Sequence, residues 1–266
     1  MKLTMLGTGH ATVTKCYNTC FVLSEQDRHF LVDAGGGNQI LRILEEEAIP
    51  LSGICDIFVS HAHTDHVLGV VWMIRMAGQR INQGKYEGRF RVFCHQELSE
   101  EIQTICRITL PGKITRLFGE RIVFAVVQDG QMQEIIGHNV RFFDIGSAKM
   151  KQFGFAIRLD GGRQLAFAGD EPLSERASRE LVNYDWLMHE AFCLYEERDI
   201  FHPYEKYHST VKDACESAER LGIKNLILYH TEDTHLQERK QRYTLEGKKY
   251  FSGNLFVPDD REAFEI

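Results

Sequence analysis

The segment 55–66, CDIFVSHAHTDH, constrains the fold of this chain more than any other. Its first part is a short, nearly continuous apolar run, which predicts a strand buried on both faces, as in a parallel sheet. Three histidines and an aspartate follow within six residues, at His61, His63, Asp65 and His66. Because buried strands of α/β folds end at loops that carry function, the segment predicts an α/β fold with a functional loop at a strand end.

The rest of the chain alternates helical and strand patterns. Apolar residues at helical spacing predict helices over 38–49, 67–78, 97–109 and 210–222. Apolar runs predict strands at 2–6, 20–24, 29–37, 89–95, 121–127, 140–145, 153–159, 164–170, 186–192 and 225–230, with hairpins over 20–37 and 153–170. No linker or repeat interrupts the pattern, so we expect a single α/β domain with mixed sheets over residues 1–266.

Composition excludes several classes of protein. The chain has a net charge of −7 and no basic run, which argues against a protein that binds nucleic acid along a wide basic face. Its seven cysteines are scattered and odd in number, which predicts reduced thiols and no disulfide framework. The first residues form no signal peptide, and no stretch is apolar enough to span a bilayer. We therefore expect a cytoplasmic protein with no membrane partner.

The histidine-rich loop has the chemistry of a metal site. Residues two apart in extended backbone point the same way, so His61 and His63 can bind one ion from one side. Asp65 and His66, where the chain turns into a helix, can face a second ion. Imidazole and carboxylate are ligands that suit a cation such as zinc.

Further ligands should stand at other strand ends. Asp170 follows the strand QLAFAG, and His230 ends the strand NLILY. Alone, each is an ordinary turn aspartate or strand-end histidine. Together with the first loop they make a two-metal set in which Asp170 can bridge the ions.

The motifs resemble those of a known superfamily. HAHTDH matches the H-x-H-x-D-H signature of the metallo-β-lactamase fold, while LGTGHATVTKCYNTC and FLVDAGGGNQI resemble the N-terminal segments of its ribonuclease Z-like, phosphodiesterase branch. FAGD, HEAF and HST resemble the later motifs of that branch. The resemblance implies a four-layer αββα sandwich of two mixed sheets flanked by helices. It also implies two divalent ions, zinc first, with manganese or iron as alternatives.

The resemblance also implies roles for individual residues. His61 and His63 hold one metal, Asp65, His66 and His230 hold the other, and Asp170 bridges them. A metal-activated hydroxide then attacks phosphorus, and Asp65 is a candidate for handling its proton. His208 matches the general acid or phosphoryl-charge stabiliser, and Glu190 orients it by hydrogen bonding.

One expected ligand is absent. The family carries a further metal-binding histidine on the loop that here spans Gly146 to Ala148, where no histidine stands. His138 lies upstream of the preceding strand and is poorly placed, and His10 is a remote substitute. The first metal is therefore expected to be held weakly. A gain in metal content and turnover on replacing Gly146 with histidine would support this expectation.

The substrate prediction follows from a second departure. Transfer-RNA-processing members carry a long arm before the GD motif, whereas this chain has only a tight hairpin between Gly154 and Gly169. We therefore expect a small or flexible phosphodiester, such as a nucleotide or short oligonucleotide, and a large folded RNA is disfavoured. Lys149 and Lys151 lie where they could meet a phosphate. Members of the family often dimerise, so a homodimer is compatible with the resemblance.

Two alternative functions are also compatible with the sequence. One is a thioester or lactone hydrolase of the same fold. The other is a non-catalytic metal- or nucleotide-binding module with an incomplete first metal site. The absent loop histidine supports the second alternative, and retention of Asp65, Glu190 and His208 opposes it, because binding alone needs no general acid.

Overall fold

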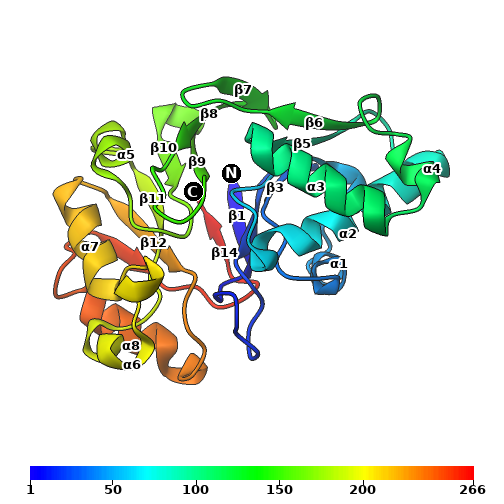
Figure 1. Ribbon diagram of the computed structural model, residues 1–266. Coiled ribbons are helices and arrows are strands. Elements are labelled where there is room, and N and C mark those ends of the chain that lie inside the picture. Colours follow the sequence, from blue (N-terminus) through cyan, green and yellow to red (C-terminus); the bar gives the residue numbers. More distant parts are fainter. The chain divides into compact units, whose positions relative to one another are not determined.

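The computed structural model describes residues 1–266 and divides them into two compact units, neither of which is a continuous segment. Unit 1 consists of Met1–Gly7, Asn18–Gln128 and Arg261–Ile266, and unit 2 consists of Thr8–Tyr17 and Asp129–Asp260. Each unit holds one seven-stranded mixed sheet with flanking helices (Figure 1). The predicted α/β class with two mixed sheets is confirmed, and the assignment of residues 1–266 to a single domain stays a prediction.

The sheet of unit 1 has the strand order β14-β1-β2-β3-β4-β5-β6. Its strands are β1 (Lys2–Gly7), β2 (Cys20–Glu25), β3 (Arg28–Val32), β4 (Ile54–Phe58), β5 (Phe90–Cys94), β6 (Ile122–Val126) and β14 (Ala263–Glu265). Its helices are α1 (Gln39–Glu46), α2 (Thr64–Asn82), α3 (Gln96–Thr109) and α4 (Gly112–Thr115).

Strands β3 to β6 run parallel, so each connection between neighbours must cross over the sheet. Helices α1, α2 and α3 make these crossovers (Figure 1). Helix α2 packs closely on the segment after β3. A Cβ atom on Gly69 would lie only 1.8 Å from the carbonyl oxygen of Ala34, so no larger residue fits there. Glycine at this position therefore lets the start of α2 approach the carboxyl end of β3.

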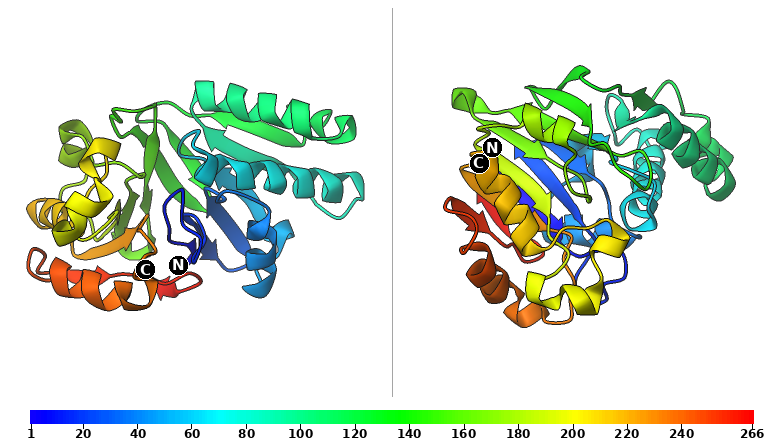
Figure 2. Two further views of the ribbon diagram at one scale, coloured as in Figure 1. Left: turned by 60° about the horizontal axis from the view of Figure 1, so that its bottom comes forward. Right: turned by 60° about the vertical axis from the view of Figure 1, so that its left-hand side comes forward.

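The sheet of unit 2 has the order β13-β12-β11-β10-β9-β8-β7. Its strands are β7 (Met132–Ile135), β8 (His138–Asp144), β9 (Phe153–Arg158), β10 (Gln164–Phe167), β11 (Trp186–Glu190), β12 (Asn225–Tyr229) and β13 (Asn254–Phe256). Its helices are α5 (Glu175–Glu180), α6 (Arg198–Phe201), α7 (Val211–Arg220) and α8 (Leu236–Gly247), of which α7 and α8 lie side by side (Figure 2).

Local sequence signals explain much of unit 2. The β9–β10 hairpin turns through Gly161 and Gly162, which have φ angles of 72° and 79° that favour glycine. Helix α7 begins with the capping box of Thr210 and Asp213. Strands β10, β11 and β12 are parallel, so their carboxyl ends meet at one edge of the sheet.

Three short strands were not predicted. β13 and β14 have three residues each, and β7 has the mixed sequence MQEI, so none shows an apolar run or alternation long enough to identify. Their partners in the sheet, rather than their own sequences, keep them extended. None of the helices combines the length and the hydrophobicity needed to cross a bilayer.

Candidate metal centre

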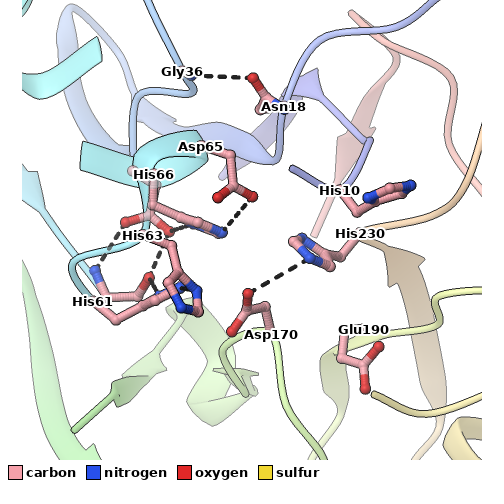
Figure 3. Close-up of polar contacts among 12 residues, drawn as sticks. His10, Asn18, Gly36, His61, His63, Asp65, His66, Asp170, Glu190 and His230 are labelled. Atoms are coloured by element: carbon pink, nitrogen blue, oxygen red, sulfur yellow. Dashed lines mark hydrogen bonds and ion pairs between the residues drawn. The ribbon is translucent and has the colours of Figure 1, made fainter. Parts of the chain in front are cut away.

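In unit 1 the predicted ligands stand at the carboxyl end of β4 and on the first turn of α2 (Figure 3). His61 is fully buried, and its Nε2 atom lies 2.8 Å from Nδ1 of His63. His63 has extended backbone and forms the N-cap of α2. The two imidazoles therefore direct a nitrogen each toward a common point, as the spacing predicted.

Asp65 and His66 lie on the first turn of α2, and both are buried. Oδ2 of Asp65 is 3.3 Å from Nε2 of His66. A carboxylate in the first turn of a helix also interacts favourably with the helix dipole. This second pair therefore presents one oxygen and one nitrogen close together.

A buried carboxylate, Asp33, orients both His66 and His61. Nδ1 of His66 donates to Oδ2 of Asp33 at 2.7 Å. The hydroxyl of Ser60 donates to the same oxygen at 2.8 Å, and Nδ1 of His61 lies 2.9 Å from that hydroxyl. Both imidazoles are therefore protonated on Nδ1, which leaves Nε2 as the atom able to bind a metal.

In unit 2, Asp170 follows β10 and His230 follows β12, so both stand at the carboxyl edge of the sheet. Oδ2 of Asp170 lies 3.5 Å from Nε2 of His230 (Figure 3). Gln152, which is 1% exposed, donates from its amide to Oδ1 of Asp170. It also accepts from the backbone N–H of Asp170 at 3.2 Å. Gln152 therefore fixes the Asp170 carboxylate from the side opposite His230.

Glu190 ends β11 and is fully buried. Its Oε1 atom accepts from the backbone N–H of Ser209, and its Oε2 atom lies 3.7 Å from Nδ1 of His208. That distance exceeds a hydrogen bond, so the direct bond expected between Glu190 and His208 is not formed here. Burial raises the pKa of Glu190 well above its ordinary value, although the Ser209 N–H opposes the shift.

His208 is held by packing as well as by polar contacts. Its ring stacks on Phe192 with centroids 4.9 Å apart, and lies 5.2 Å from the ring of His230. Burial lowers the pKa of His208 to about 4, and the Asp170 carboxylate partly opposes this. The ring is therefore neutral near pH 7 and carries one N–H.

The loop from Gly146 to Ala148 carries no ligand but is well organised. The hydroxyl of Ser147 and the N–H of Ala148 donate to the Glu171 carboxylate at 2.8 and 3.1 Å. Gly146 has a φ of 75°, and a Cβ atom there would lie 2.8 Å from the Ser174 side chain. The proposed Gly146→His test is therefore unsuitable, because it would introduce backbone strain and a clash.

His138 and His10 differ in position. His138 begins β8, and its Nδ1 atom lies 3.0 Å from the carbonyl oxygen of Arg158, away from the other candidate ligands of unit 2. His10 packs on Phe192 with ring centroids 4.5 Å apart, and its ring is 6.3 Å from that of His230. His10 therefore borders this edge of the sheet.

The candidate ligands are His61, His63, Asp65 and His66 in unit 1, and Asp170 and His230 in unit 2. Together these side chains supply four imidazoles and two carboxylates, which suit divalent ions such as zinc. The hydrogen bonds of Asp33 support this chemistry, because they leave Nε2 of His61 and His66 unprotonated. The residues present therefore fit a pair of divalent ions.

Sequence reasoning missed the residues that support the ligands. Asp33 stands directly after β3, the parallel neighbour of β4, and this position at a strand end was an available signal. Gln152 and Glu171 gave no comparable signal, because each acts through a partner on another segment. Their roles depend on the pairing of β9 with β10, which brings Gln152 beside Asp170.

Comparison with known proteins agrees with this geometry. Residues 1–249 match the family model described as "Anti-Pycsar protein Apyc1". The chain belongs to this family. The chain is also 28% identical to a ribonuclease Z of Bacillus velezensis, over 99% of this chain and 98% of that protein. The predicted ribonuclease Z-like resemblance is therefore confirmed.

Solved structures identify the fold. YhfI of Bacillus subtilis, a metallo-β-lactamase fold protein, matches with a TM-score of 0.80 and 17% identity, over 100% of this chain and 99% of that one. The short form of human tRNase Z matches with a TM-score of 0.76 and 19% identity, over the same shares of the two chains. This member of the family therefore has the metallo-β-lactamase fold, as predicted.

Proposed function

We propose that this protein is a metal-dependent phosphodiesterase that acts on small or flexible phosphodiesters, such as nucleotides or short oligonucleotides. His61 and His63 would hold one divalent ion, Asp65, His66 and His230 the other, and Asp170 would bridge them. Zinc is the first candidate, because imidazole and carboxylate are its usual ligands. When bound, the ion pair would supply activated water near neutral pH and offset charge on the phosphoryl group.

The observation that carries this proposal is the position of His208. Its neutral, buried ring lies beside His230 and faces the ammonium group of Lys149, with Nε2 and Nζ 3.4 Å apart. An N–H and an ammonium group on this edge suit a substrate with anionic oxygens. They suit the neutral carbonyl of a lactone or thioester less well. As a neutral ring, His208 would donate a hydrogen bond to the phosphoryl group and so stabilise the charge that develops there.

Glu190 would act on His208 through Ser209. Because Glu190 accepts from the Ser209 N–H, it fixes the backbone beside His208 and not the ring itself. Burial raises the pKa of Glu190, which favours its neutral carboxyl form. The charged side chains near His208 are then those of Lys149 and Asp170. Glu190 would thus be a positioning residue.

The preference for small substrates is supported by the hairpin and by the alignment. The β9–β10 connection spans only Leu159 to Arg163. The alignment with the Bacillus velezensis relative runs over 311 positions although this chain has 266 residues, so that relative carries residues with no counterpart here. A compact site without added segments would accept a nucleotide more readily than a folded RNA.

The test is hydrolysis of bis(p-nitrophenyl) phosphate by protein reconstituted with zinc, manganese or iron. His208→Ala should lower kcat by about 100-fold or more, as expected for the loss of a hydrogen-bond donor to the charge that develops in the transition state. His138→Ala is the matched control, because His138 lies away from the candidate ligands, and it should keep full activity. A panel of cyclic nucleotides, short oligonucleotides and folded RNA would then rank the substrates. Absence of turnover with all three metals would contradict the proposal.

A further inference from the structure

The loop between β8 and β9 carries a lysine near the position where the resemblance expects a metal-binding histidine. Lys149 extends from this loop so that Nζ lies 3.4 Å from Nε2 of His208. The contact joins two segments that are 59 positions apart in the sequence. A cation therefore stands beside the residue proposed to meet the phosphoryl group.

The backbone of Lys149 is fixed by a buried carboxylate. Glu171, which is 3% exposed, accepts from the Ser147 hydroxyl at 2.8 Å and from the Ala148 N–H at 3.1 Å. The Ser147 oxygen in turn accepts from the N–H of Lys149 at 3.3 Å. Glu171 directly follows Asp170, so the segment that presents a metal ligand also holds the loop that presents the lysine.

The charges at this contact favour an anion. The partner of the Lys149 ammonium is a ring nitrogen and not a carboxylate, so its charge is not neutralised there. In this contact Nε2 of His208 accepts from the ammonium group, because an ammonium group can only donate. A phosphate oxygen that replaced Nε2 as the partner of Lys149 would receive a charge-assisted hydrogen bond, which is the stronger class, and Nε2 would be free to carry the ring proton and donate to the same phosphate.

We propose that Lys149 is a substrate-binding residue whose ammonium group binds a non-bridging phosphate oxygen next to His208, with Glu171 as the residue that positions its loop. The inference rests on the proposed function, because it names the group that recognises the substrate of that site. It also explains how a chain with a net charge of −7 retains a local attraction for an anion.

Kinetics on bis(p-nitrophenyl) phosphate test the proposal through three lysine variants. Lys149→Met should raise KM and lower kcat/KM by about 10- to 100-fold, the range for a hydrogen bond to a charged group. Lys149→Arg keeps the charge and should stay within a few-fold of wild type. Lys85→Met, at an exposed lysine beyond the carboxyl end of α2, is the control and should match wild type. Equal kcat/KM for Lys149→Met and wild type would overturn the proposal.

Glu171→Gln tests the positioning role. It weakens the acceptor for Ser147 and Ala148 but leaves Lys149 in place. KM should rise by a smaller factor than in Lys149→Met, and kcat should change little. Loss of kcat at unchanged KM would show that Glu171 acts on another part of the site.

Binding of inorganic phosphate, measured by calorimetry on the metal-loaded protein, separates this inference from the proposed function. Phosphate affinity should fall about 10-fold or more in Lys149→Met and stay unchanged in Lys85→Met. If wild type binds phosphate through Lys149 but hydrolyses no phosphodiester, the proposed function fails and the inference stands. If wild type is an active phosphodiesterase and both variants bind phosphate equally, the inference fails and the function stands.

Discussion

Nδ1 of His66 donates to Oδ2 of Asp33 over 2.7 Å, and both side chains are 1% exposed. The same oxygen accepts from Ser60, which bonds to His61. One carboxylate thus orients two candidate ligands that the proposed function assigns to different ions. A carboxylate bound to a ligating histidine also raises the basicity of the ring.

Asp33→Ala should therefore weaken metal binding by about 10- to 100-fold, the usual effect of losing such a partner. Titration of the metal-free protein against a chromophoric chelator would measure it. Asp56→Ala is the matched control, because Asp56 is buried on the neighbouring strand but pairs with Arg91. That variant should lose stability and keep its metal affinity. Equal metal affinity in Asp33→Ala and wild type would contradict the orienting role.

Gln152→Leu should loosen Asp170 and reduce metal affinity about 10-fold or more. The change removes the amide that donates to the Asp170 carboxylate and the oxygen that accepts from its N–H. Stability should fall by about 1–3 kcal/mol, because a buried backbone N–H loses its acceptor. Chelator competition and urea unfolding would measure the two effects. Gln96→Leu, at an exposed glutamine, should change neither; if Gln152→Leu did the same, Gln152 would not hold Asp170.

Much of the fold could be predicted because its signals are local. The apolar runs of β4 and β12, the glycines of the β9–β10 turn and the capping box of α7 each lie within a few neighbouring residues. The ligands could be predicted for a related reason. Parallel strands bring their carboxyl ends to one edge, so an aspartate or histidine directly after such a strand already has a known position.

The supporting residues could not be predicted in the same way. Gln152 matters only because β9 pairs with β10 in one register, and Glu171 only because its loop lies against Ser147. Neither contact can be predicted from the neighbouring sequence. The direct hydrogen bond expected between Glu190 and His208 illustrates the same limit. The sequence places the two side chains near each other, but it does not show that Oε2 of Glu190 and Nδ1 of His208 lie 3.7 Å apart, which is too far for a hydrogen bond.

Glu190→Gln should stabilise the metal-free protein as pH rises. Because burial raises the folded-state pKa of Glu190 above its ordinary 4.5, the folded state retains a proton that the unfolded state has lost. The contribution of wild-type Glu190 to stability is therefore full below pH 4.5 and decreases as pH rises toward the folded-state pKa. In that window the variant should gain about 1.4 kcal/mol over wild type per pH unit.

Urea unfolding of both metal-free proteins at pH 4.5, 6 and 7.5 would measure this difference. Glu87→Gln, at an exposed glutamate, should follow wild type at every pH. A constant difference between Glu190→Gln and wild type across the three pH values would mean that Glu190 is ionised in the folded protein. Activity should stay close to wild type in Glu190→Gln, since the amide oxygen can accept the Ser209 N–H in place of the neutral carboxyl group.

Ala148→His, and not Gly146→His, is the variant that can supply the absent loop histidine. Gly146 has a φ of 75° and no room for a Cβ atom beside Ser174, so Gly146→His should lower stability by about 1–3 kcal/mol without a gain in metal. Ala148 is exposed and outside the left-handed region, and its backbone bond to Glu171 survives substitution. Metal analysis after dialysis should therefore show higher occupancy in Ala148→His than in wild type, with a similar Tm. If both variants kept wild-type metal content and stability, the loop would not approach the ligands, and the site would be complete without a histidine there.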